Sequence, residues 1–184
     1  MAYRRDYRYK RKRSFFTNLS FTNLIIMINI VVFLLIWVAL LAGLGDFVIN
    51  FFALNPGLFF QGYVWALVSS MFMHVLPVHL IANMVSLFFI GTFVERIIGR
   101  KRYLWFYLIS GLVAGLFFVF LAFLGQFIPN GEVFFGGFNI PALGASGALF
   151  GLGGLLAVLI PRLKVLLFFI IPMPIWFAMF IFLV

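Results

Sequence analysis

Hydrophobic residues occur in long runs along this chain, and short polar stretches separate them. The runs cover residues 24–43, 77–98, 103–124, 145–160 and 165–184. Most are close to 20 residues long, and an α-helix of about 20 residues crosses the ~30 Å hydrocarbon core of a bilayer. No run alternates apolar and polar residues, which disfavours an outer-membrane barrel. The pattern predicts an all-α polytopic membrane protein with five transmembrane helices, the fifth bent by Pro172 and Pro174.

Two connections between the runs are unusually apolar. Residues 43–76 carry many large hydrophobic side chains but are interrupted by glycine, asparagine and proline, so no part of them reaches spanning length. Within them, Asn55-Pro56-Gly57 is typical of a turn. We expect a structured loop with short helices that lie in the outer membrane interface. Residues 125–143 form a second predicted loop.

The composition supports a membrane protein. Hydrophobic residues make up 66% of the 184 residues and charged residues 9%, whereas soluble domains have about 25% charged residues. The chain has no cysteine, which excludes disulfides, thiolate metal sites and cysteine catalysis.

The 13 basic residues form three clusters beside the apolar runs, at residues 4–13, 96–102 and 162–164. The loops 43–76 and 125–143 contain no lysine or arginine. Because basic residues stay on the cytoplasmic side, we expect a cytoplasmic N-terminus and two outward-facing loops. Residues 1–20 form a basic tail, whose cations would each contribute about 1 kcal/mol at an anionic lipid surface. This placement favours lipid over nucleic acid as the partner of the positive charge.

One hydroxyl lies among small residues, in Gly144-Ala145-Ser146-Gly147-Ala148-Leu149-Phe150-Gly151. A polar side chain inside a hydrocarbon segment is costly and commonly functional. The neighbouring glycines would let a substrate backbone or another helix approach Ser146 closely. Since the fourth helix is expected to begin here, its first N–H groups are available to an oxyanion. Taken alone, the serine is weak evidence for catalysis, since serines often line helix contacts in membranes.

His79 and Asn83 are four residues apart, so they share one face of the second helix. The charge topology places both at a depth similar to that of Ser146. An imidazole and an amide on one face could donate hydrogen bonds to the oxygen of a tetrahedral intermediate. The alternative is that they only tie helices together.

Other kinds of chemistry find little support. His74 and His79 are five apart, a poor spacing for two metal ligands on one helix face, and a zinc site needs three or four ligands. We therefore expect no metal and no cofactor. A transporter or channel is disfavoured because no span carries a charge well inside it.

Four motifs occur in order along the chain: Trp65-x-Leu67-Val68-Ser69-Ser70-Met71-Phe72-Met73-His74, His79-x-x-x-Asn83, Gly91-x-x-x-Glu95 and the run Gly144 to Gly151. Taken together, they resemble the rhomboid family of intramembrane serine proteases, whose nucleophile motif is G-x-S-G. The likeness begins at about Leu24. We therefore divide the chain into a tail, residues 1–20, and a rhomboid-like transmembrane domain, residues 21–184.

The resemblance implies six helices around a water-filled cavity that opens outward. It implies Ser146 as nucleophile within a motif that includes Gly144 and Gly147. His79, Asn83 and the Ser146 N–H would stabilise the oxyanion, and Phe150 would pack against the catalytic imidazole. Residues 43–76 would be the membrane-embedded loop, and residues 165–184 the helix beside which transmembrane substrates enter.

The sequence departs from the family at the general base. The family's base is a histidine on a sixth helix, in an Ala-His-x-x-Gly setting, but no histidine follows His79. An unactivated serine is a poor nucleophile at neutral pH. We therefore expect an incomplete rhomboid protease that cleaves transmembrane proteins near the outer face and is nearly inactive as these 184 residues, unless His79 serves as the base. The alternative is a non-catalytic rhomboid-like protein that binds client transmembrane helices.

Overall fold

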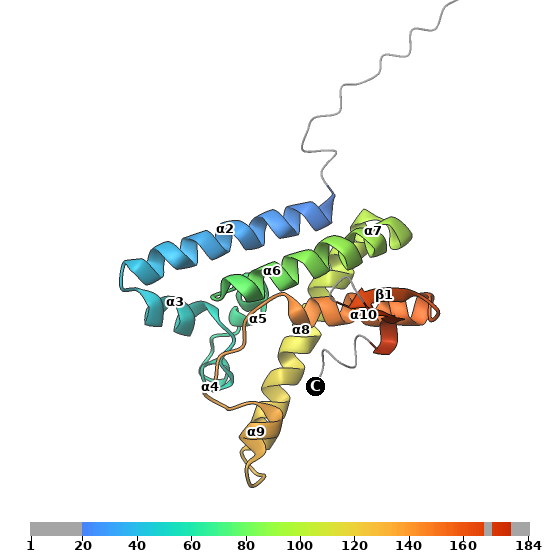
Figure 1. Ribbon diagram of the computed structural model, residues 1–184. Coiled ribbons are helices and arrows are strands. Elements are labelled where there is room, and N and C mark those ends of the chain that lie inside the picture. The colour runs from blue at the N-terminus through green and yellow to red at the C-terminus, as the bar shows by residue number, and fades with distance from the viewer. Residues whose placement is uncertain (1–19, 168–170, 178–184) are drawn as a thin grey trace, which may run out of the picture.

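The computed structural model describes residues 20–167 and 171–177, and its main body is a bundle of helices (Figure 1). In this part of the chain, three helical stretches are long and apolar enough to cross a membrane: Phe21–Leu41, Pro77–Ile98 and Arg100–Gly125. The first is α2 and the third is α8. The second consists of α6 (Pro77–Ser86), the π-helical turn η2 (Leu87–Gly91) and α7 (Thr92–Ile98). The first three predicted spans are confirmed, with ends that differ by a few residues.

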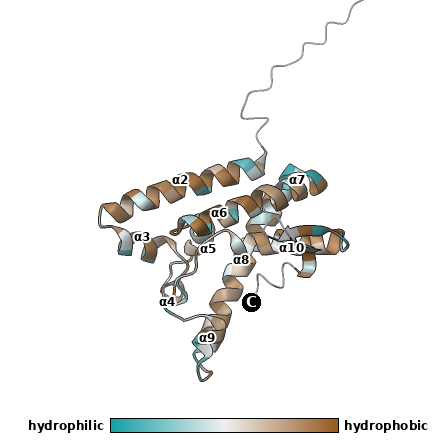
Figure 2. Cartoon of the chain, in the orientation of Figure 1, coloured by the Kyte–Doolittle hydropathy of each residue, from teal (hydrophilic) through white to brown (hydrophobic). Residues whose placement is uncertain are grey.

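The predicted fourth span is also an apolar helix, α10 (Ser146–Leu159), but it is shorter than the others. Its 14 residues rise about 21 Å, less than the ~30 Å thickness of the hydrocarbon core. Hydrophobic residues dominate α2, α8 and α10 along most of their length (Figure 2). The helical membrane class is therefore confirmed.

The first loop is built from short helices, as predicted. They are α3 (Gly45–Phe52), α4 (Pro56–Phe60), α5 (Ala66–Ser69) and the 3-10 turn η1 (Ser70–Phe72). One detail differs from the prediction: Asn55-Pro56-Gly57 is the start of α4, not a free turn. The Asn55 side chain accepts hydrogen bonds from the N–H groups of Gly57 and Leu58, and proline suits the first helical position because it has no N–H to satisfy. The second loop contains α9 (Gly131–Phe135).

Small residues allow α10 to lie close against α8. A Cβ atom on Gly147 would come within 2.7 Å of the Ala114 Cβ, and one on Gly151 would collide with the Ser110 side chain. Helices approach this closely only where side chains are minimal. This contact fixes the distance between the helix that begins at Ser146 and the longest helix of the bundle.

The predicted fifth span is wrong for residues 165–167 and 171–174, which are extended, whereas residues 175–177 are helical. Strands β1 (Lys164–Leu167) and β2 (Ile171–Pro174) form an antiparallel pair, with Val165 opposite Met173. Pro172 and Pro174 explain the difference. Each lacks an N–H group, and its ring clashes with the preceding helical turn, so two prolines this close interrupt a helix but are tolerated in an edge strand. Residues 168–170 and 178–184 of this predicted span lie outside the described residues.

Candidate active site

The first loop fixes the segment that leads into α10. Leu54 and Ala142 exchange two backbone hydrogen bonds of 3.0 and 2.9 Å. The Gly144 N–H donates to the Ser70 carbonyl at 2.9 Å. Earlier in the first loop, the Gly57 N–H donates to the Phe138 carbonyl at 2.9 Å. The position of Ser146 therefore depends on residues about 75–90 positions earlier in the chain, as well as on its own helix.

Gly144 lies directly against two imidazole rings. Its φ is +118°, a left-handed conformation that strains any residue with a side chain. A Cβ atom at this position would lie 2.8 Å from His79 Cε1 and 3.6 Å from His74 Nε2. Glycine is thus required both by the backbone angle and by the closeness of the rings.

His74 belongs to this site, although the sequence reasoning set it aside. Its side chain is fully buried, and its Nε2 accepts a 3.5 Å hydrogen bond from the Ala145 N–H. Its ring lies 5.0 Å from that of His79. The spacing argument considered His74 and His79 only as metal ligands, and it did not consider that His74, which precedes the start of α6 at Pro77, could lie beside the His79 ring. The family motif that ends at His74 was the signal for its importance.

The buried position of His74 also determines its charge. Burial, together with the neighbouring His79, lowers the pKa of His74 from 6.5 to about 4. His74 is therefore neutral at physiological pH, and a neutral imidazole nitrogen can accept the hydrogen bond from Ala145.

His79 and Asn83 lie in the first turns of α6, and the His79 ring lies against Gly144, just before α10. Leu80 and Met84 of α6 share a buried cluster with Ala145, Ala148 and Leu149. Asn83 is 5% exposed, and its Nδ2 donates a 2.9 Å hydrogen bond to the His79 carbonyl. An amide nitrogen carries two hydrogens, so this bond uses only one of the two donors of Asn83.

Ser146 is half-buried at the first position of α10, next to the fully buried Ala145. Ala145, the residue before this helix, makes no side-chain capping hydrogen bond, and its own N–H donates to His74 Nε2. The first N–H groups of an α-helix have no partner in the helix itself and carry the positive end of its dipole. Phe150 is half-buried one turn further on, on the same face as Ser146.

The arrangement combines a hydroxyl, helix N–H groups and two histidines at one end of the bundle, which suits the stabilisation of a negatively charged oxygen. The described residues contain no group of three or more metal-binding side chains.

The sequence of this region also matches known proteins. A profile of the Rhomboid domain covers residues 61–184. This chain belongs to the rhomboid family. Rhomboid protease GluP of Bacillus subtilis is 32% identical over 150 residues, which cover 80% of this chain and 26% of that rhomboid. RHOMBOID-like protein 12, mitochondrial, of Arabidopsis thaliana is 33% identical over 135 residues, or 70% of this chain and 39% of the relative.

A third relative is Rhomboid protein 1, mitochondrial, of Saccharomyces cerevisiae, which is 33% identical over 109 residues, covering 59% of this chain and 29% of its own length. The matched region thus spans well under half of each of these rhomboids. Membership of the rhomboid family and the three apolar helices together make this an integral membrane protein.

Proposed function

We propose that this rhomboid is an intramembrane serine protease that hydrolyses peptide bonds of transmembrane proteins near the outer face of the membrane. The observation that carries the proposal is the uncapped start of α10 at Ser146, with the rings of His74 and His79 against Gly144. A structural helix end of this kind would normally be capped by a side chain.

In the proposed reaction, Ser146 Oγ attacks the carbonyl carbon of the substrate and gives its proton to a general base. The Ser146 N–H, His79 and Asn83 donate hydrogen bonds to the oxyanion. Collapse of the tetrahedral intermediate breaks the C–N bond, and the leaving amine takes up the proton. Water then hydrolyses the acyl-enzyme and regenerates the Ser146 hydroxyl. The base is proposed to lie on a sixth helix, as the family resemblance implies, because no histidine follows His79 within these 184 residues.

We also propose that the N-terminus is cytoplasmic, that the basic residues 1–20 rest on anionic lipids, and that the loops 43–76 and 125–143 face outward. The support is the distribution of charge. The two loops have only acidic charges, Asp46 and Glu132, whereas the connection that includes Arg100 and the one that includes Arg162 are basic. This orientation puts the start of α10 near the outer surface.

The test joins a sixth-helix segment that carries the family's histidine after Val184, and measures cleavage of a transmembrane substrate in reconstituted vesicles. Replacing the nucleophile with Ser146→Ala is expected to lower turnover by about 10⁴-fold or more. Ser86→Ala, at a half-buried serine of α6, is the matched control and should stay near the parent rate. Cleavage by Ser146→Ala as fast as the parent would refute the proposal.

The second candidate is a non-catalytic rhomboid-like protein that binds client helices. Binding of a client helix needs no general base, so this candidate is compatible with His74 and His79 as the two histidines among these 184 residues. A fluorophosphonate probe separates the two. Labelling of Ser146 in the extended protein supports the protease, and the absence of labelling alongside retained binding of a client helix supports the binding protein.

A further inference from the structure

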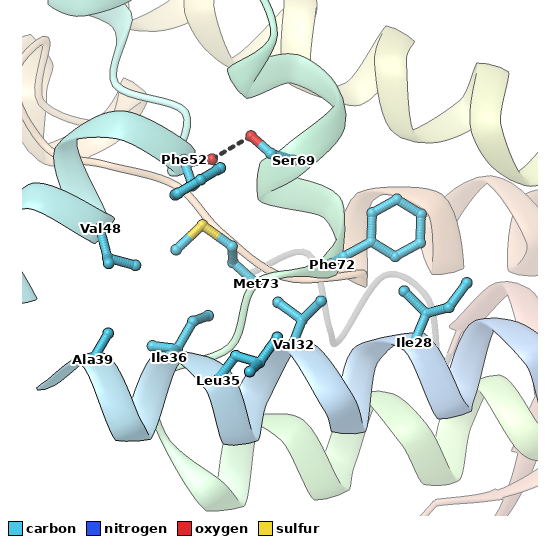
Figure 3. A pocket seen from close by; sticks show the side chains of 10 residues that line it. All are labelled: Ile28, Val32, Leu35, Ile36, Ala39, Val48, Phe52, Ser69, Phe72 and Met73. Carbon is cyan, nitrogen blue, oxygen red and sulfur yellow. Dashed lines mark hydrogen bonds between the residues drawn. The ribbon is translucent and has the colours of Figure 1, made fainter. Parts of the chain in front are cut away.

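An apolar groove runs along α2 beside the first loop (Figure 3). One wall is a stripe of α2, whose members Ile28, Val32, Leu35, Ile36 and Ala39 recur at helical spacing. The other wall comes from α3, α5, η1 and the residue after η1, and it consists of Val48, Phe52, Ser69, Phe72 and Met73. The cavity has a volume of about 390 Å³.

The side chains that line the groove are almost all apolar and leave few hydrogen-bonding groups for water. Ser69 is the one polar lining residue, and its hydroxyl donates a 2.7 Å hydrogen bond to the Phe52 carbonyl. Carbonyls of the loop around the groove are satisfied in the same way. Trp65 Nε1 donates to the Phe51 carbonyl at 2.8 Å, and Trp37 Nε1 donates to the Val75 carbonyl at 3.1 Å. Polar groups must be satisfied within the protein where the surroundings are hydrocarbon.

The groove opens toward the bilayer. Leu35 is 63% exposed and Ile28 39% exposed on its rim, on a helix whose length and composition let it cross the membrane. From Ile28 to Ala39, α2 rises about 17 Å, close to half of the ~30 Å hydrocarbon core. The groove therefore extends over about the depth of one lipid leaflet, at the end of α2 that lies beside the first loop.

The size of the groove excludes a helix as its occupant. An α-helix with side chains is about 10–12 Å across, so a volume of this size would hold only about one turn. An unbranched hydrocarbon chain, one carbon wide, fits the same space along its length. We propose that the groove between α2 and the first loop binds a single acyl chain of a membrane phospholipid.

The proposal predicts where a photoreactive lipid attaches. The protein is reconstituted in phosphatidylcholine vesicles that contain phosphatidylcholine with a diazirine midway along one acyl chain, and the adducts are mapped by mass spectrometry. Adducts at Val32, Ile36 and Met73 should exceed those at Val31 and Leu34, which are exposed on α2 but do not line the groove, by about tenfold.

A matched pair of variants tests the groove itself. Val32→Phe places a ring in the cavity, whereas Val31→Phe makes the same substitution at the neighbouring exposed position, where the parent valine is 54% exposed. Labelling at Ile36 and Met73 should fall about tenfold in Val32→Phe and stay unchanged in Val31→Phe.

Three outcomes would overturn the proposal. The first is even labelling of all exposed α2 residues in the parent protein, which means lipid contact without a site and is readable even if Val32→Phe does not fold. The second is unchanged labelling of Ile36 and Met73 in folded Val32→Phe. The third is a groove protected from the lipid probe by a second copy of the chain, detected as a cross-link between two proteins.

Discussion

Two helix N-termini in this protein, those of α2 and α10, differ in whether side chains accept hydrogen bonds from their first N–H groups. At the start of α2, Glu95 of α7 accepts hydrogen bonds from the N–H groups of Phe21 and Thr22, both at 2.9 Å, and from the Thr22 hydroxyl at 2.7 Å. The Ser20 hydroxyl accepts another from the Asn23 N–H at 3.1 Å. At the start of α10, the described residues provide no side-chain cap. At both ends, the first N–H groups have no partner within their own helix, and both ends carry the positive end of the helix dipole.

The two helix ends differ in the side chains that pack against them. The α2 end receives a buried carboxylate, which is also 3.7 Å from Arg100 Nε, so its donors are used within the fold. At the α10 end, His74 Nε2 accepts a hydrogen bond from the Ala145 N–H, and the N–H groups of Ser146 and Gly147 have no side-chain acceptor among the described residues. A helix end capped by a distant carboxylate stabilises the bundle, whereas an uncapped end is less stable but can bind a developing negative charge.

Removing the α2 cap should produce the largest change. Glu95→Ala leaves the buried N–H and hydroxyl of Thr22 and the partly buried N–H of Phe21 without their acceptor, and it is expected to lower the free energy of unfolding by about 3–5 kcal/mol. Unfolding in mixed micelles, followed by circular dichroism, measures this loss. Glu132→Ala is the control, because Glu132 is exposed in the first turn of α9. Equal stability of the two variants would mean that Glu95 does not hold α2.

A change at the uncapped end should affect the reaction instead. In the protein extended by a sixth helix, Asn83→Ala removes a proposed oxyanion donor and should lower turnover by about 10²-fold. The amount of folded protein should change less, because the Asn83 bond to His79 is made within α6. If folded protein is lost while turnover per folded molecule is unchanged, Asn83 is a packing residue only.

Much of this comparison could be predicted from the sequence. The hydrophobic runs identified α2, the Pro77–Ile98 stretch and α8, because spanning length alone distinguishes such helices from other elements. The order of the motifs pointed to Ser146, His79 and Asn83. The similar depth of Ser146 and His79 was inferred from charge topology, which does not indicate which helices are neighbours.

The parts of the site and of the fold that the sequence did not predict depend on contacts between residues far apart in the chain. The bond from Gly144 to the Ser70 carbonyl and the approach of His74 to Ala145 join positions about 70 apart, and no local pattern encodes such pairs. The capping of α2 by Glu95 has the same origin. The strand pair at residues 164–167 and 171–174 was predicted as helix because hydrophobicity outweighed the local effect of Pro172 and Pro174.

The start of α10 lacks a cap, so close packing on α8 should hold it in place. Gly151→Ala would drive a methyl group into Ser110 and is expected to cost about 1–3 kcal/mol. Gly154→Ala makes the same change in the same helix where a Cβ meets nothing within 4 Å, and it should stabilise the protein by up to about 1 kcal/mol through helix propensity. Unfolding free energies measured side by side test this contrast. A similar change in both variants would show that the contact with α8 does not position α10.

The last effect appears only on acidification and is absent at neutral pH. His74 lies before α6, outside the three spanning stretches, and burial lowers its pKa from 6.5 in the unfolded chain to about 4 in the fold. As the pH falls from about 6.5 to about 4, the unfolded chain binds a proton at His74 and the folded chain does not, so His74 makes stability fall through this range. Subtracting the pH profile of His74→Gln from that of the parent isolates this contribution from the carboxylates. The difference should decline between these two pH values and level off below about 4. A difference that is independent of pH would show that the imidazole beside Ala145 is not buried in its neutral form, and the contrast between the two helix ends would then rest on the missing side-chain cap alone.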